Sequence, residues 1–173
     1  MNTEFIDKME RIKKGVQKYV KCDKVLFVFA KSNNDNCIVF LYDEESEKPL
    51  LPMWLHLEPK DTEKHLRDGN LSMMSPLNDI ENEIMGCELI VDDDSGRFFV
   101  KLKQRGMRMR EFELVTDADG NPAVISKISG SMTRLDFGYC KFKPGMLVPD
   151  HFILFGQETT TGESKQEKID FIP

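Results

Sequence analysis

The chain has few cysteines and no hydrophobic run long enough to cross a membrane. Its apolar runs stay well short of the ~20 residues that a spanning helix needs, and the charges spread through residues 1–20 are unlike a secretory leader. The cysteines lie far apart, mostly in or beside apolar strand-like segments, which is typical of buried thiols in a reducing compartment. They are Cys22, Cys37, Cys87 and Cys140. The sequence therefore predicts a cytoplasmic protein with no membrane span.

The common catalytic motifs are also absent. The sequence contains no G-x-S-x-G elbow, phosphate-binding loop, dinucleotide fingerprint, H-E-x-x-H helix or C-x-x-C pair. Its three histidines, His56, His65 and His151, stand in separate segments, so no metal site is predicted and no cofactor is expected. These absences argue against an enzyme without excluding one, and we assign no catalytic residue.

Length and composition indicate a single globular domain. The chain has 173 residues, 40% hydrophobic and 31% charged, and a chain of this size buries roughly 70% of its unfolded surface. The net charge of −6 argues against nucleic acid as the partner. Because no repeat or long linker divides the sequence, we expect an amphipathic N-terminal helix over residues 1–22 packed on one β-rich domain over residues 23–173.

Most of the chain has the pattern of short β-strands. Residues 88–143 alternate apolar and polar side chains between acidic turns, as in antiparallel meanders. Residues 24–30 and 37–42 are continuous apolar runs, which predict strands covered on both faces. Gly138 inside a strand pattern suggests a bulge or a close backbone approach. With about nine strands, we predict a mainly β (α+β) fold, either an antiparallel β-sandwich or a flattened β-barrel.

Two helices are expected outside this sheet. Residues 4–20 carry apolar side chains at spacings of three and four. A second, short helix is predicted from an N-cap at Ser75, through Pro76 in the first helical position, to a stop at Gly86. Its apolar stripe consists of Leu77, Ile80 and Ile84. The polar residues 59–70 fit either a further short helix or a loop.

Residues 53–58 join the single tryptophan to a histidine and a carboxylate. Alternation places Trp54, His56 and Glu58 on one strand face, opposite three apolar side chains. Such a mixture is found where a sheet lines a pocket, and also where a half-buried tryptophan lies under a loop. We select Trp54 and His56 as candidate binding residues.

The segment KLKQRGMRMR, residues 101–110, holds five basic residues in ten. If it forms a hairpin around Gly106, several charges gather on one side and form an anion or phosphate site. A charged outer face that protects an edge strand explains the same residues. The further candidate ligand- or partner-binding residues are Lys101, Lys103, Arg105, Arg108 and Arg110.

Two acidic turns, at residues 92–94 and 117–121, place several oxygens close together. The second begins like a calcium loop, but its twelfth position is Ile128 rather than a bidentate glutamate. A hairpin turn with Gly120 at positive φ accounts for the same residues, and we predict no cation site.

Several short motifs follow one another in a recognisable order. They are the Asn-rich turn at residues 32–36, a proline shortly before Trp54, a helix ending at Gly86, Asp119-Gly120, Ile128-Ser129-Gly130, and residues 152–156 followed by Thr161-Gly162 and Glu167. In this order, over about residues 26–173, the chain resembles the domain-of-unknown-function 4833 family of small uncharacterised proteins. The resemblance implies no known activity, and no site residue is carried over from it.

Three functions are compatible with these features. We favour a non-enzymatic binding or protein-interaction module whose partner surface includes Trp54, His56 and the basic segment. The second is a carrier of a small lipophilic ligand, which requires an apolar internal cavity. The third is a small hydrolase or isomerase in which His56 or His151 acts with a carboxylate such as Glu58 or Asp150. The expected partner is a protein or a small ligand, and the expected state is a monomer or homodimer.

Overall fold

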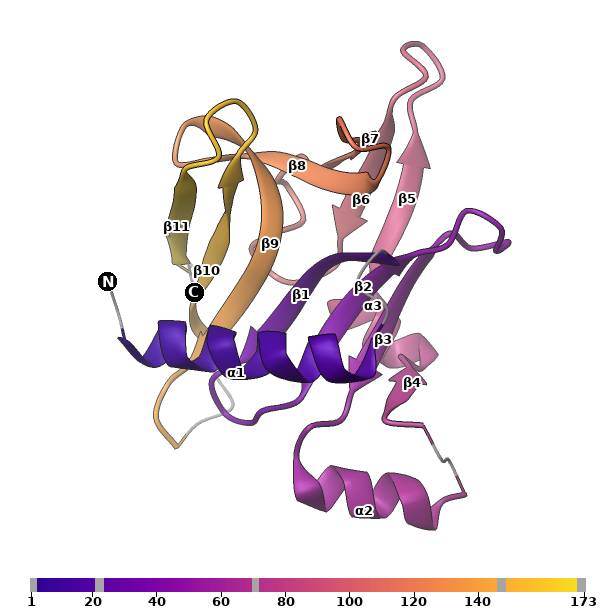
Figure 1. Cartoon of the computed structure of the whole chain (residues 1–173), viewed down its shortest axis with the longest axis vertical. Helices are drawn as coiled ribbons and strands as arrows, with labels where there is room; N and C mark the ends of the chain where they lie inside the picture. The colour runs from indigo at the N-terminus through magenta and orange to yellow at the C-terminus, as the bar shows by residue number, and fades with distance from the viewer. Residues whose placement is uncertain (1–2, 21–23, 70–71, 146–148, 171–173) are drawn as a thin grey trace.

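The fold is mainly β with helices outside the sheet, as the sequence predicts (Figure 1). The computed structural model describes residues 3–20, 24–69, 72–145 and 149–170. Its helices are α1 (Thr3–Tyr19), α2 (Pro59–Arg67) and α3 (Asp79–Met85). Its strands are β1 (Val25–Lys31), β2 (Cys37–Tyr42), β3 (Leu50–Leu55), β4 (Met74–Pro76), β5 (Cys87–Val91), β6 (Phe98–Leu102), β7 (Glu113–Thr116), β8 (Pro122–Ile128), β9 (Ser131–Phe142), β10 (Pro149–Glu158) and β11 (Ser164–Asp170).

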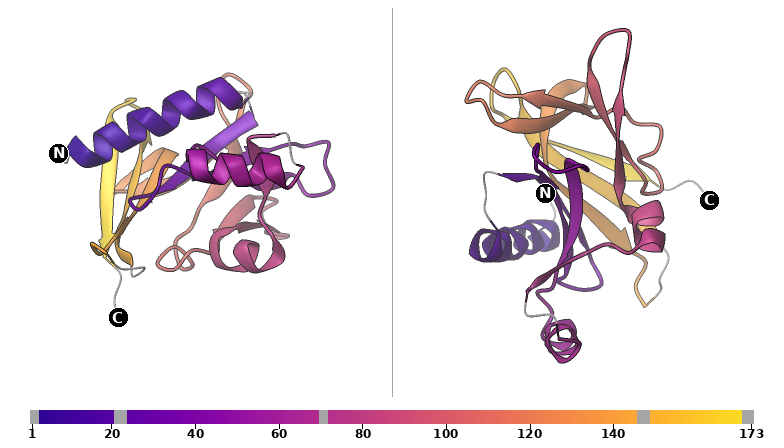
Figure 2. Two further views of the ribbon diagram at one scale, coloured as in Figure 1. Left: turned by 90° about the horizontal axis from the view of Figure 1, so that it is seen from below. Right: turned by 90° about the vertical axis from the view of Figure 1, so that its right-hand side faces the viewer.

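The strands form one sheet that divides at β9. Neighbours run β4-β3-β2-β1-β9-β8-β7-β6-β5, and β10 and β11 continue from the other edge of β9. The long strand β9 has two neighbours on one edge, because residues 131–134 pair with β8 and residues 137–140 pair with β1. Two arms, β1–β4 and β8–β5, leave β9 and curl toward each other as a half-barrel (Figure 2).

One pairing corrects the antiparallel prediction: β1 and β9 run parallel. Val28 lies opposite Phe137. The chain that connects these two neighbouring strands contains the rest of the first arm, β2–β4, and the whole of the second arm, β5–β8. Local alternation predicts hairpins between consecutive strands but carries no information about a pairing between such distant segments.

The concave side of the half-barrel holds a core rich in phenylalanine. The rings of Phe27 and Phe40 stack with centroids 4.4 Å apart, and Phe29 packs edge-on against Phe40 and Phe152, each at 5.2 Å. A Cβ on Gly138 would lie 2.3 Å from the Phe29 ring, so the close backbone approach predicted there is confirmed. The other arm contributes Val100, Leu102 and Val124 to the same core.

Helix α1 covers the convex side, where Figure 1 shows it lying across the sheet. Its buried apolar residues pack on side chains from β1, β2, β3, β9 and β10, and the Phe5 ring lies 5.5 Å from that of Tyr139. Lys8 is only 5% exposed, and its Nζ donates to the Asn34 carbonyl (2.5 Å) and to Asp35 Oδ1 (2.7 Å). Helix α1 is therefore an integral part of the fold.

Helix α3 begins three residues later than predicted. Its N-cap is Asn78, whose Oδ1 accepts from Glu81 N (2.8 Å) while Asn78 N donates to Glu81 Oε1 (2.9 Å). This reciprocal capping box gives hydrogen-bond acceptors to two backbone N–H groups, those of Asn78 and Glu81. Ser75, the predicted N-cap, lies in β4 instead. The predicted stripe does not pack on the sheet, because two of its members are 73% and 56% exposed. These are Ile80 and Ile84.

Candidate functional site

Trp54 and His56 lie on the same face of β3, as alternation predicts. Leu55 between them points to the other side, where it is buried in the core beneath α1. Both candidate residues line a polar hollow of 360 Å³ between β3, β4, α2 and α3. We call this end of the half-barrel, lined by Trp54, His56, His65, Ser75 and Glu81, the mouth.

The Trp54 ring is held from two directions. Its Nε1 donates to Glu81 Oε2 on α3 (3.1 Å), and the Nζ of Lys31, at the end of β1, lies 5.0 Å from the ring centroid. Burial lowers the pKa of Lys31 from its ordinary value, while Cys140 and Glu81 act in the opposite direction. A partly desolvated ammonium therefore lies on an aromatic face beside the mouth.

Two histidines stack in the mouth. The rings of His56 and His65 have centroids 4.6 Å apart, and His56 Nε2 lies 2.8 Å from Ser75 Oγ. Burial, and then the neighbouring His65, lower the pKa of His56, which favours its neutral form. Among the residues described, His56 Nδ1 and His65 Nε2 are buried without a hydrogen-bond partner.

Asn36 positions α2 over the mouth. Its Oδ1 accepts from Leu57 N (2.7 Å) and Glu58 N (2.8 Å), and its Nδ2 donates to Asp61 in the first turn of α2. Helix α2 itself has no buried residue, so these hydrogen bonds at its start and the contact between the two histidines hold it in place.

The arrangement of titratable groups gives the enzyme hypothesis limited support. Glu58 does not pair with His56, because its Oε1 accepts from Asp35 N (2.5 Å). His151 Nδ1 does lie 2.9 Å from Asp150 Oδ2, but the Asp150 side chain is 50% exposed. Within the described part of the chain, no group of three or more His, Cys, Asp or Glu side chains is arranged to hold a metal ion.

The basic segment forms a loop rather than a hairpin. Strand β6 ends at Leu102, and a loop folds around Gly106 at a φ of 88° and the fully buried Met107. A buried side chain at this position fixes the loop against the core, which alternation in a short segment does not reveal.

The five basic side chains are distributed over several partners. Lys103 Nζ pairs with Glu88 (3.2 Å), and Arg110 pairs with Glu167 on β11. Arg108 Nε donates to the Lys103 carbonyl (3.0 Å). Lys101 is exposed on β6, and Arg105 is exposed near Lys31, where both line one small hollow. The structure thus brings Arg105 close to the mouth and directs Arg110 elsewhere.

In both acidic turns, an aspartate side chain accepts hydrogen bonds from groups of the same turn. Asp92 accepts from Asp94 N (3.2 Å) and Ser95 Oγ (2.8 Å), and Asp117 Oδ1 accepts from the backbone N of Asp119 and of Asn121, both at 2.9 Å. Side-chain caps of this kind are ordinary turn chemistry.

The half-barrel is open along one seam, which lies between β3 and β5 and contains a hollow of 720 Å³. Along β5, Lys103 N donates to the Gly86 carbonyl (3.0 Å) and Asp92 N donates to the Arg97 carbonyl (2.9 Å). Hydrogen-bonded pairs alternate along an antiparallel ladder, so three residues of β5 direct their backbone N–H and C=O away from β6 and into the seam. They are Cys87, Leu89 and Val91.

The chain matches no protein-family model, no curated protein and no solved structure. The resemblance to the domain-of-unknown-function 4833 family, the cytoplasmic location and the oligomeric state therefore stay predictions. In the described ranges no helix is long and apolar enough to cross a membrane.

Three features of these sites escape sequence reasoning. Asn36 sits in an Asn-rich turn of generic appearance, and Lys31 ends an apolar strand, so neither stands out. The open edge of β5 depends on the pairing order of the arms. One local feature of the sequence did point to an unprotected edge. Proline and lysine usually protect a sheet edge from pairing, and residues 87–91 contain neither.

Proposed function

We propose that the protein is a non-enzymatic interaction module that takes up an extended segment of a partner protein as an additional strand on β5. The observation that carries the proposal is the open seam. Among the described pairings, β6 is the sole neighbour of β5, and Cys87, Leu89 and Val91 present backbone donors and acceptors to the seam. Main-chain hydrogen bonds to such an edge supply affinity for an incoming strand.

The other free edges are protected against pairing. By the same alternation, Pro52 occupies a position on β3 whose N–H would face the seam, and Pro76 occupies an outward position on β4. Strand β11, at the far edge, carries Lys165 and Lys168. Proline and lysine are residues that keep sheet edges from pairing with other chains. The contrast supports β5 as the docking edge.

The concave face beside β5 favours apolar side chains on one side of the partner strand. Cross-strand pairing places Val91, Phe98, Leu114 and Val124 in one row. Exposure rises along this row from 0% at Val124 to 44% at Phe98 and 49% at Val91. A strand added to β5 would extend the row and cover its two exposed members. The partner segment is therefore expected to carry apolar residues at every second position.

Charge around the seam favours basic residues at the alternate positions. Acidic side chains outnumber basic ones along the hollow, and Lys103 is already paired with Glu88. A second copy of this chain, with a net charge of −6, would bring the same acidic excess against itself, so we commit to a basic partner. The acidic residues of the hollow that have no ion pair within the described part of the chain are Glu47, Asp79 and Glu83.

Selection from a displayed library of random 12-residue peptides tests the proposal. The expected outcome is enrichment of extended sequences that alternate apolar residues with Lys or Arg. For the enriched peptide, Val91→Pro, which removes one free N–H, is expected to weaken binding about tenfold or more. Val91→Ala is the matched comparison because it keeps the N–H and removes only part of the side chain, and it is expected to weaken binding less than Val91→Pro does.

Three results would overturn the proposal. One is the absence of enriched sequences, and another is equal affinity of Val91→Pro and Val91→Ala. The third is a concentration-dependent dimer of the wild type that Val91→Pro abolishes, which would assign the edge to a second copy. Thermal unfolding of both variants verifies that the half-barrel is intact.

A further inference from the structure

A small apolar hollow lies beside the mouth, on the other side of Lys31 from the histidine pair. Its volume is 170 Å³, and its walls are mainly apolar side chains of the concave core and of α3. Phe29, Ile38, Ile84 and Phe152 are among them. An apolar cavity of about 150 Å³ is large enough for a benzene molecule. The hollow therefore fits one aromatic ring or a short branched chain.

Lys31 gives this hollow a positive charge. Within the described part of the chain, its ammonium has no hydrogen bond or ion pair, and its contact is the Trp54 ring at 5.0 Å. A partly buried ammonium loses hydration that an aromatic face restores only in part. Burial also lowers the Lys31 pKa. An anion beside Lys31 would restore the lost stabilisation through a charge-assisted hydrogen bond.

We infer that the hollow is a binding site for a small carboxylate with a ring-sized apolar body, held by Lys31 at its carboxylate end. The exposed Arg105 also lines the hollow. The apolar body lies against Phe29, Ile38 and Phe152. Removal of its surface from water favours binding, and the ion pair supplies selectivity for an acid over a neutral analogue.

This inference is independent of the proposed strand docking. The hollow and the seam share no lining residue, so either site can fail its test while the other succeeds. It also differs from the selected histidine site, because His56 and His65 line the polar hollow on the other side of Trp54.

Trp54, the single tryptophan of the chain, provides the readout. The purified full chain is titrated with phenylacetate, and both the tryptophan emission and the heat of binding are recorded. We expect saturable binding that changes the emission, because the ligand contacts the ammonium on the Trp54 ring. The neutral analogue 2-phenylethanol has the same ring without the charge and is expected to bind more weakly by on the order of 10- to 100-fold.

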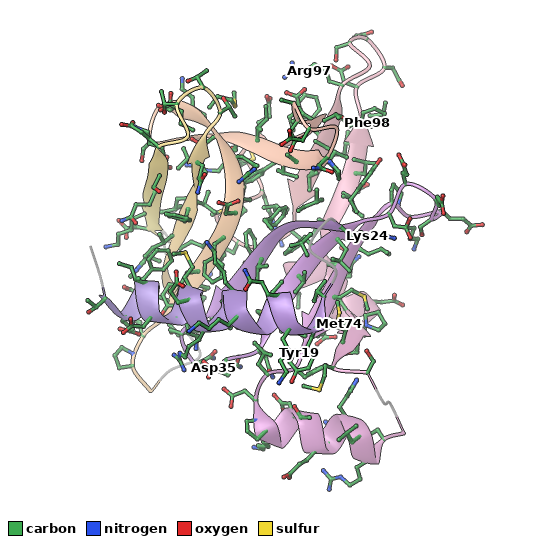
Figure 3. All side chains as sticks on the ribbon, viewed as in Figure 1. Tyr19, Lys24, Asp35, Met74, Arg97 and Phe98 are labelled. Atoms are coloured by element: carbon green, nitrogen blue, oxygen red, sulfur yellow. The ribbon has the colours of Figure 1, made fainter. Side chains whose placement is uncertain are left out.

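Two lysine variants complete the design. Lys31→Met keeps the aliphatic length of the side chain and removes its charge. The affinity of this variant for phenylacetate is expected to be lower than that of the wild type by on the order of 10- to 100-fold. Lys24→Met is the matched control. Lys24, labelled in Figure 3, directly precedes β1, whereas Lys31 ends it, and Lys24 lines a separate hollow with Phe98. It should bind like the wild type.

The inference is overturned by any of three results. The first is no saturable heat or emission change at millimolar phenylacetate. The second is equal binding of 2-phenylethanol, which would make the site a plain apolar hollow. The third is wild-type affinity in Lys31→Met, measured by calorimetry because the substitution itself alters the surroundings of Trp54.

Discussion

Asn36 joins three segments that are distant in the sequence. Its side chain, 4% exposed, serves two backbone donors after β3 and one carboxylate of α2. Asn36→Ala would leave the partly buried donors Leu57 N and Glu58 N without their side-chain acceptor, so we expect the free energy of unfolding to fall by about 2–3 kcal/mol. Urea unfolding of the wild type and the variant measures the difference.

The neighbouring Asn33 is an exposed asparagine of the same turn and gives the control. Asn33→Ala is expected to change the free energy of unfolding by no more than about 0.5 kcal/mol. If both alanine variants lost the same small amount, Asn36 would not be the anchor of α2.

His56 makes stability depend on pH. Its pKa in the folded protein is below the ordinary value of 6.5, first through burial and then through His65, while Asp61 and Glu81 oppose the shift. Between the lowered pKa and 6.5 the unfolded chain binds more protons, so the folded state loses stability as the pH falls through this range. We expect a smaller loss between pH 7.5 and pH 5 in His56→Gln than in the wild type.

Chemical unfolding at several pH values tests this expectation. His151→Gln serves as the control, because His151 lies on β10 and its Nδ1 contacts Asp150 rather than the mouth. An unchanged pH profile in His56→Gln would show that this imidazole does not report on the mouth.

At the residue scale, the sequence predicts faces better than partners. Alternation correctly placed Trp54 and His56 together, because the side-chain period of a strand is a local property. It paired His56 with Glu58, whereas the structure places His65, Ser75 and Glu81 around Trp54 and His56. Those neighbours come from α2, β4 and α3, whose positions depend on the fold as a whole.

At the scale of elements, the two outer helices near the mouth differ from α1 in how they are held. Helix α1 buries five side chains, whereas α2 and α3 bury none. Opening α2 costs little apolar burial, so its amides are expected to exchange with solvent through local opening. We expect protection factors in α2 to be lower than in α1 by on the order of 100-fold.

Hydrogen exchange followed by NMR or mass spectrometry measures this difference. The central residues of α1 provide the internal reference in the same sample, so no variant is needed. Equal protection of the two helices would mean that α2 opens only when the whole molecule unfolds.

The same elements show where local signals fail. Ser75-Pro76 is a sound helix start by composition, but the reciprocal bonds of Asn78 and Glu81 define the start three residues later. A hairpin at Gly106 was one of two interpretations of the basic segment, and burial of Met107 makes it a compact loop instead. In both cases an interaction within the segment that its composition does not reveal determined the result.

At the scale of the molecule, the class of fold was predictable and its connectivity was not. Short alternating and apolar runs predicted a strand-rich domain with an external N-terminal helix, which the structure confirms. The division of the sheet at β9 was not predictable from local patterns. Strand β9 extends beyond its pairing with β8, and its further residues pair with β1, which is distant in the sequence. This pairing leaves the seam between β3 and β5 at the free edges of the two arms.

The parallel pairing of β1 with β9 also sets an order of events during synthesis. Phe27, Phe29 and Phe40 leave the ribosome with the first arm, but β9 and β10, which help to cover them, are made about one hundred residues later. At about 5–20 residues per second, this interval lasts roughly 5–20 s. During that time three phenylalanine rings lack part of their permanent cover. The nascent chain is therefore a natural client for chaperones that hold exposed apolar segments.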